Sequence, residues 1–307
     1  MMRYFLWALV AAIALVAPFQ VYPILLMTIL CFMVFASSFN LLLGYAGLLC
    51  FGHAMFFGTA AYLSGWLLKN TGLSIELAFL AAALAMAGLG YLVGVISARR
   101  GGIQFAMITL AIAQFVYFLL LRAPFTGGED GLQRIPRSAL FGVIDVSSNL
   151  ALYYVVLGFS VLAIALFWRI VHSPFGEVLR AIRDNEARVE SLGFQPERFK
   201  ILALTLSAGL AGLAGAMKAA VYQIATLHDV SWHVSGTIIF MVLLGGLGTL
   251  TGPMVGAAMI VLLNDHLAQF GEWALIIQGS VFLAVILFFR RGLVGEIKAR
   301  FMKAARP

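Results

Sequence analysis

The stretch Ser173 to Leu192, SPFGEVLRAIRDNEARVESL, is followed by Gly193 and is the one long charged segment in an otherwise apolar chain. Ser173 suits an N-cap, Pro174 suits the first helical position, and Gly193 can take the left-handed conformation that ends a helix. The stretch therefore predicts one helix or two short ones. Its two faces differ, with apolar residues at helical spacing on one and charged residues on the other: Phe175, Val178, Leu179, Ile182, Val189 and Leu192 against Glu177, Arg180, Arg183, Asp184, Arg188 and Glu190.

This amphipathic stretch lies between two strongly apolar segments, 150–171 and 201–221, so we expect it at a membrane surface. One interpretation is a solvated loop that only connects two membrane helices. The other is a docking helix for a cytosolic partner, because a capped helix with an apolar stripe can lie in a partner's groove. We favour this cytoplasmic coupling helix and place its loop at about 172–200.

Composition indicates a membrane protein. Hydrophobic residues make up 63% of the 307 residues, charged residues make up 11%, and the mean hydropathy is +1.01. These values predict an all-α polytopic membrane protein, with residues 1–307 forming a single transmembrane domain. The net charge of +7 does not indicate nucleic-acid binding, because six of the twenty basic residues follow Phe289 beside an apolar segment, where they suit the anionic surface of the lipid bilayer.

The apolar runs predict about ten transmembrane helices, with nine still possible. They lie near 4–17, 21–43, 52–68, 77–97, 103–121, 150–171, 201–221, 234–247, 254–263 and 273–289. The excess of basic residues then places both termini and the coupling loop in the cytoplasm and the loop at about 122–149 outside. The first run imitates a signal peptide, but Pro18 sits badly for cleavage, so we expect an uncleaved helix.

Glycines recur at similar spacings after the second and eighth predicted spans. Such glycines often serve only close packing of membrane helices. Alternatively, glycine-broken backbone at corresponding points of two halves marks a translocation path. The candidate path residues are these glycines and nearby polar side chains: Asn40, Gly44, Gly47, Gly52, His53, Gln104, Gln114, Gly245, Gly248 and Gly252.

The sequence offers little catalytic chemistry. No lysine is followed by Ser or Thr, so the chain lacks a phosphate-binding P-loop of its own. Ser160 after Gly158 is a weak hint of a hydrolase nucleophile. The residues His228, Asp229, His233, Asp265 and His266 suit ordinary connecting loops better than zinc, so no metal site is expected.

Several motifs together resemble one transporter family. They are GGIQFAMITLAIAQ at 101–114, TGGEDGL at 126–132, SPFG and LRAIRDNE within 173–186, and LSAGLAGLAGA at 206–216, with the two glycine segments at 44–62 and 243–257. The chain thereby resembles the branched-chain amino acid ABC transporter permeases of the LivM type, in order over about 40–292. Position 50 departs from the family, which commonly has a small polar residue where this chain has Cys50.

The resemblance implies a bacterial inner-membrane permease that imports leucine, isoleucine or valine. Its implied partners are a second homologous permease, two cytosolic ATPase subunits and an extracytoplasmic substrate-binding protein. The chain itself is then expected to need no cofactor, since ATP and Mg²⁺ bind to the ATPase subunits.

The resemblance also suggests where the partners bind. The ATPases would contact the coupling helix, with Phe175, Leu179 and Ile182 filling an apolar groove of the partner. The full set of expected coupling residues is Phe175, Val178, Leu179, Arg180, Ile182, Arg183, Glu186 and Gly193. The binding protein would dock by charge matching on the outer loop, at Gly127, Gly128, Glu129, Asp130, Arg134 and Arg137.

Three alternatives stay open from the sequence. The same machine could import urea, short amides or aromatic acids, because specificity resides largely in the binding protein. A secondary transporter or channel would be expected to carry acidic residues near span centres, which this chain lacks. An intramembrane enzyme has no convincing site.

Overall fold

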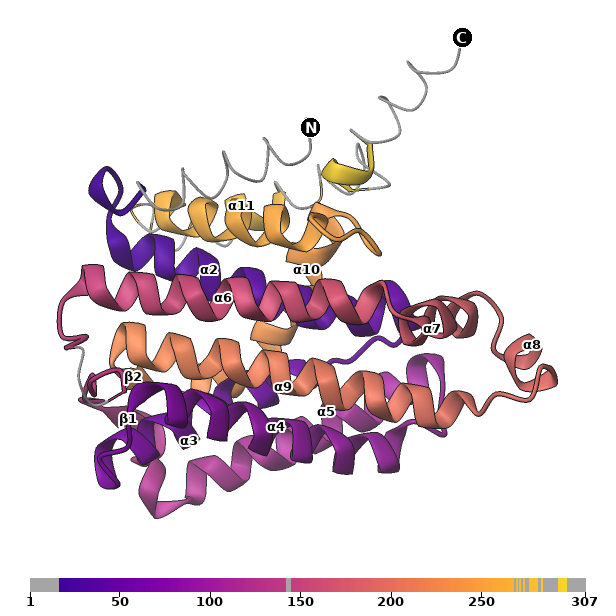
Figure 1. Cartoon of the computed structure of the whole chain (residues 1–307), viewed down its shortest axis with the longest axis horizontal. Helices are drawn as coiled ribbons and strands as arrows, with labels where there is room; N and C mark the ends of the chain where they lie inside the picture. Colours follow the sequence, from indigo (N-terminus) through magenta and orange to yellow (C-terminus); the bar gives the residue numbers. More distant parts are fainter. Residues whose placement is uncertain are drawn as a thin grey trace, which may run out of the picture.

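The computed structural model describes residues 17–141 and 145–267, together with 269, 271, 273, 276–280, 283 and 292–296. Over this part the chain is almost wholly helical (Figure 1). The first predicted span, except for Ala17, lies outside the described residues, and so does the predicted basic tail. Most of the last predicted span is also outside them.

Every predicted span between residues 21 and 263 coincides with a helix. These helices are α2 (Pro23–Asn40), α3 (His53–Asn70), α4 (Ile75–Ser97), α5 (Gly102–Arg122), α6 (Asn149–Val171), α9 (Pro196–Tyr222), α10 (Trp232–Gly245) and α11 (Gly252–Leu267). Helix α2 continues into a π-helical turn, η2 (Leu41–Ala46). Five of the described helical segments are long and apolar enough to cross a bilayer, and α10 is shorter but apolar. The protein is thus an all-α polytopic membrane protein, as its composition predicts.

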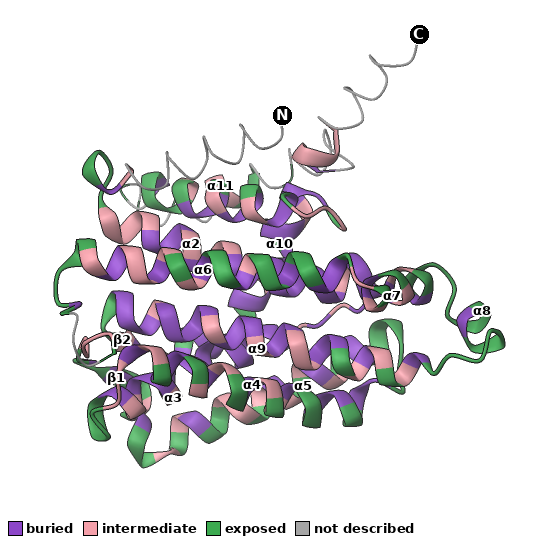
Figure 2. Ribbon diagram, in the orientation of Figure 1, coloured by how far each residue is buried: buried purple, intermediate pink, exposed green. Residues whose placement is uncertain are grey.

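Helix α9 forms the centre of the bundle and packs on α4, α3 and α2. Small residues let these backbones approach one another: a Cβ atom at Gly212 would lie 2.7 Å from Cβ of Met86, and one at Gly215 would overlap the carbonyl oxygen of Phe57. Figure 2 shows α9 buried along most of its length. The glycines of α9 therefore serve close helix packing, as is usual in membrane bundles.

The outward faces of α4, α5 and α6 carry large apolar side chains. Leu84, Phe115 and Leu162 are 65%, 68% and 63% exposed, respectively. Such surfaces are unfavourable in water but suit lipid or a second membrane subunit. These faces match the apolar exterior that a membrane protein requires.

Two polar regions occupy opposite ends of the bundle (Figure 1). One end holds α7 (Pro174–Asp184) and α8 (Glu186–Ser191). The other holds β1 (Leu132–Gln133) and β2 (Ile224–Ala225), a short antiparallel pair in which Leu132 faces Ala225. The coupling loop and the outer loop are therefore separated by the length of the bundle.

Candidate functional site

The charged stretch folds into two short helices, as the sequence predicts. Helix α7 begins at Pro174, and Ser173 occupies its N-cap position, but the Ser173 hydroxyl donates to the carbonyl of Ile170 at 2.6 Å instead of capping α7. Helix α8 is capped by Asn185, whose Oδ1 accepts from the backbone N–H of Arg188 at 3.0 Å. Gly193 ends the element with φ of 87°, the left-handed conformation expected there.

The apolar stripe of α7 faces the protein's own interior, so the expectation that it fills a partner's groove was wrong. Leu179 is 0% and Ile182 is 4% exposed, while Phe175 stacks on Phe199 of α9 with ring centroids 5.8 Å apart. Helical apolar spacing is the same for a helix that docks on a partner and for one that packs on its own bundle. The structure shows the second case.

The surface left for a partner is the outer side of α8 and the turn after it. Leu192 is 69% exposed and Phe194 is 47% exposed, next to the exposed Gly193. Val178 is half-buried and belongs to the inner face of α7. The 192–194 turn therefore carries large exposed apolar side chains of this loop.

Two expected coupling residues hold this loop in place. Arg180 donates to Glu177 at 2.8 Å and to the carbonyl of Val171 at 3.2 Å. Glu186 accepts from Lys200, whose side chain is only 4% exposed. These contacts tie α7 to the end of α6 and α8 to the start of α9, so the loop is held against the bundle.

Arg183 connects α7 to both glycine-rich segments. Its Nη1 donates to the carbonyl oxygen of Gly44, and a Cβ atom at Gly47 would lie 2.8 Å from the Arg183 Cγ. A Cβ atom at Gly248 would lie 3.3 Å from the same Nη1. The guanidinium thus lies where the end of η2 meets the α10–α11 turn.

Asn40 joins these two segments directly. Its Nδ2 donates to the carbonyl of Thr249 at 2.9 Å, and its Oδ1 accepts from the N–H of Gly248 at 3.1 Å. The position of Gly44 has no room for a side chain, since a Cβ would lie 2.6 Å from the Gly248 nitrogen. We name the contact of Asn40, Gly44 and Gly47 with Gly248 and Thr249 the glycine junction.

The other two glycines of the second segment close the α10–α11 turn. A Cβ atom at Gly245 would overlap the carbonyl oxygen of Gly252. The φ angles of Gly246 and Gly248, 120° and 67°, are left-handed values that favour glycine. Close backbone packing, one of the two interpretations of the glycine pattern, therefore holds throughout this turn.

The segment from Gly47 to Gly52 is non-helical and enters the bundle. It leaves η2 through Gly47 with φ of 71°, and Cys50 within it is fully buried. A Cβ atom at Gly52 would overlap the carbonyl oxygen of Thr109 on α5. Non-helical backbone is tolerated in a membrane where protein covers it, as it does here.

His53 and the glutamines lie apart from the glycine junction. His53 opens α3, its Nε2 lies 3.0 Å from the Ser38 hydroxyl, and its ring stacks on Phe35. Gln104 is exposed near the start of α5, and Gln114 is half-buried beside Ala113 on that helix. The structure therefore does not bring all the sequence-predicted path residues to one place.

The outer loop is built by left-handed glycines. It contains η3 (Pro124–Thr126) and η4 (Gly128–Asp130), and Gly127, Gly128 and Gly131 all have positive φ. A Cβ atom at Gly131 would overlap the carbonyl oxygen of Ala225, so this glycine allows the β1–β2 contact. The loop is thus fastened to the chain that follows α9.

The charged residues of the outer loop divide into two groups. Glu129, Asp130 and Arg134 are exposed at the surface. Arg137 instead donates to the carbonyls of Ser147 and Val221, at 3.0 and 3.1 Å, and to Oδ1 of Asn149 at 2.8 Å. Arg137 therefore fastens the loop to α6 and α9, and desolvation in this position lowers its pKa.

The sequence did not predict the buried ion pair between Lys218 and Asp229. Lys218 of α9 bonds Asp229 of η5 (Leu227–Val230), and the side chain of Asp229 is only 4% exposed. The 226–231 segment turns back into the bundle, where Val230 packs against Gly58. The sequence predicted an ordinary connecting loop for Asp229, but this return buries its side chain beside Lys218. Over the described residues no three His, Cys, Asp or Glu side chains gather as a metal site.

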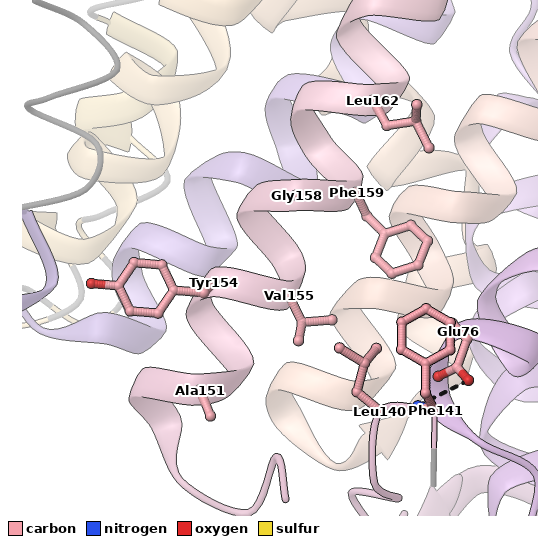
Figure 3. A pocket seen from close by; sticks show the side chains of 9 residues that line it. All are labelled: Glu76, Leu140, Phe141, Ala151, Tyr154, Val155, Gly158, Phe159 and Leu162. Carbon is pink, nitrogen blue, oxygen red and sulfur yellow. Dashed lines mark hydrogen bonds between the residues drawn. The ribbon is translucent and has the colours of Figure 1, made fainter. Parts of the chain in front are cut away.

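One cavity is an apolar groove of about 510 Å³ between α6 and the start of α4 (Figure 3). Its lining includes Ala151, Val155, Phe159 and Leu162 along α6. Glu76 lies at one end and accepts from the N–H of Phe141 at 3.0 Å. None of the residues of the glycine junction lines this groove.

The fold and the site define a multi-pass helical membrane subunit whose charged loop is bonded to a glycine-built turn inside the bundle. Over residues 22–288 the sequence matches the family described as branched-chain amino acid transport system permease component. The chain therefore belongs to this family, as its motifs indicated, and is a permease-type membrane subunit.

Curated relatives agree with this assignment. The high-affinity branched-chain amino acid transport system permease protein LivM of Salmonella typhimurium is 29% identical over 95% of this chain and 75% of its own length. LivM of Escherichia coli is 28% identical over 86% and 67%, respectively. The autoinducer 2 import system permease protein LsrC of Salmonella paratyphi B is 27% identical over 81% and 75%. No solved structure matches the chain significantly.

Proposed function

We propose that this chain is the inner-membrane permease subunit of an ATP-driven importer of branched-chain amino acids. It forms half of the translocation path beside a second homologous permease, with both termini in the cytoplasm. Two cytosolic ATPases, which bind ATP and Mg²⁺, contact the α7–α8 loop, and an extracytoplasmic binding protein delivers the amino acid at the outer loop. The names of the two LivM relatives support this cargo.

The observation that carries the proposal is the Arg183 contact. A transport subunit without its own P-loop depends on ATP hydrolysis by another protein. The conformational change that this hydrolysis drives must reach the membrane interior. Arg183 lies on the charged loop and bonds the backbone at Gly44, in the glycine junction. Movement of α7 by the ATPases therefore acts directly on the junction.

The junction behaves, in this proposal, as a two-state contact at the cytoplasmic end. In the described state Asn40 holds the α10–α11 turn against η2. When the ATPases close, α7 pulls Arg183 and separates the two segments. This separation converts the inward-closed form of the permease into the inward-open form. A ligand-driven change of this kind requires contacts that differ between the states, and these hydrogen bonds supply them.

The test is uptake of radiolabelled leucine by proteoliposomes that contain the whole complex, with the ATPases and ATP on one side and the binding protein on the other. We expect accumulation that requires both ATP and the binding protein. Uptake of urea, an amide or the autoinducer-type cargo named for LsrC, without leucine uptake, would keep the machine and change its substrate. Leucine uptake that ignores ATP would contradict the proposal and indicate a carrier or channel.

A further inference from the structure

A second cavity lies between α3 and α5, towards the end that carries the outer loop. Its volume is about 370 Å³, and it is lined by Thr59, Tyr62, Leu63, Trp66, Leu120 and Phe125. This size falls at the lower end of the roughly 300–1,000 Å³ typical of small-molecule sites. The walls are aliphatic and aromatic, and the polar side-chain atoms in the lining are the hydroxyls of Thr59 and Tyr62 and the indole nitrogen of Trp66.

Both hydroxyls lack a hydrogen-bond partner among the described residues. The Oγ1 atom of Thr59 and the phenolic oxygen of Tyr62 are shielded from solvent, and Tyr62 as a whole is only 1% exposed. An unsatisfied buried polar group costs about 1–3 kcal/mol, so such groups are normally paired. Thr59 and Tyr62 are three residues apart on α3, which places them on one face of the helix. Two orphaned hydroxyls in one apolar pocket indicate that a ligand satisfies them.

The pocket lies directly beneath the outer loop. Phe125, part of its lining, belongs to η3 and precedes Gly127 and the exposed Glu129 by only a few residues. The chain after this loop also packs on α3, since a Cβ atom at Gly65 would lie 2.6 Å from Cδ1 of Ile135. A solute released onto this loop would reach the pocket before it reached the glycine junction at the other end of the bundle.

We propose that this pocket is a transient binding site for a small amino acid with an aliphatic side chain, on the outer part of the translocation path. The inference rests on the proposed function and adds the residues that receive the cargo. The aliphatic side chain packs against Leu63, Trp66 and Leu120, while the hydroxyls of Thr59 and Tyr62 bond its polar end. Aliphatic and aromatic walls of this kind match an aliphatic side chain, whose apolar surface they remove from water.

Neutral hydroxyls suit a site on a path. They bond the ammonium or carboxylate of an amino acid more weakly than a charged side chain does. A transport pathway must release its cargo, and the high affinity can reside in the binding protein. The pocket is therefore built for selection by shape and for fast release.

The first test follows access to the pocket. In the whole complex, Leu63→Cys, at a partly exposed position of the pocket lining, is treated with a small thiol reagent from the outer side; the native Cys31 and Cys50 are fully buried and give little background. We expect leucine-loaded binding protein with ATP to slow labelling several-fold, and arginine or ribose at the same concentration to leave it unchanged. Phe118→Cys, on α5 outside the pocket lining, is the control and should not be protected. Equal labelling of Leu63→Cys with and without leucine would overturn the proposal.

The second test removes only the hydroxyls. In Thr59→Val and Tyr62→Phe the shapes are kept, so we expect leucine uptake to fall about tenfold in the double variant while its thermal midpoint is unchanged or higher. A purely structural role predicts the reverse, a lower midpoint with normal uptake per folded complex. Tyr91→Phe, exposed on α4, serves as the matched control. If the unmodified complex takes up no leucine with ATP, the proposed function fails; if it does and these variants match it, only the pocket fails.

Discussion

Asn40 ends α2, and both polar atoms of its carboxamide bond the α10–α11 turn, about 200 positions later in the sequence. It is fully buried, and its two bonds reach Thr249 and Gly248. Asn40→Leu keeps the approximate shape but leaves a buried N–H and a buried carbonyl without partners. We expect a loss of about 1–3 kcal/mol per group, seen as a lower thermal midpoint of the purified protein.

The matched control for Asn40 is Thr205→Val. The Thr205 hydroxyl bonds only the carbonyl of Ile201 in its own helix, at 2.9 Å. That carbonyl already takes part in the helical ladder, so the control should change stability little. Equal midpoints for Asn40→Leu and the unmodified protein would show that the junction bonds contribute nothing to stability.

Lys218 and Asp229 form the second residue-scale feature. Lys218→Met leaves the carboxylate of Asp229 buried and uncompensated, which for a fully buried pair costs about 3–5 kcal/mol. The Lys218 side chain keeps 19% exposure, so we expect the lower end of that range. The double variant Lys218→Met, Asp229→Asn should recover much of the loss in thermal unfolding. A double variant as unstable as the single one would show that the charges are not coupled.

At the scale of elements, α7 and the turn after α8 are expected to have different roles. Helix α7 stabilises the bundle, and the turn binds the ATPases. Leu179→Ala creates a cavity in the bundle and should cost about 2–5 kcal/mol. Leu192→Ala changes an exposed side chain and should alter stability by no more than about 0.5 kcal/mol, yet reduce co-purification of the ATPases. The two variants are compared by thermal midpoint and by the amount of ATPase retained. Loss of ATPase binding from Leu179→Ala at full stability, with none from Leu192→Ala, would reverse the assignment of the two faces.

Elements whose pattern has one physical cause could be predicted from the sequence. A bilayer demands long apolar runs, so the spans from α2 to α11 were found, and Pro174 and Gly193 bracketed α7 and α8 because few residues suit those positions. The direction of the α7 stripe could not be predicted, since inward packing and partner docking need the same spacing. The Arg183–Gly44 bond joins residues 139 positions apart, and no local signal encodes it.

The same limit applies to the candidate site. The glycine spacing singled out the two segments, but it did not predict that they contact each other through Asn40, Gly44 and Gly248. Asp229 lies in a polar stretch typical of a surface loop, and only the return of η5 beside Gly58 buries it. No sequence pattern marked Thr59 and Tyr62 as residues of a pocket, because a single Thr or Tyr is common in a membrane helix.

For the whole molecule, the central proposal is that the α7–α8 loop drives the glycine junction. Three features support it: an ion pair between Glu186 and Lys200 ties the loop to α9, Arg183 bonds the junction, and the outer loop occupies the far end of the bundle (Figure 1). A movement of α7 therefore reaches the junction through the Arg183 side chain. Removal of that side chain should uncouple ATP hydrolysis from transport.

The most direct measurement is the ratio of leucine transported to ATP hydrolysed in proteoliposomes, for the unmodified complex, for Arg183→Gln and for Arg188→Gln. Arg183→Gln removes a charge-assisted bond of about 1.5–3 kcal/mol, so the ratio should fall roughly tenfold or more while hydrolysis and assembly persist. Arg188→Gln removes an exposed charge from α8 and should keep the ratio. An unchanged ratio in Arg183→Gln would contradict coupling through the junction.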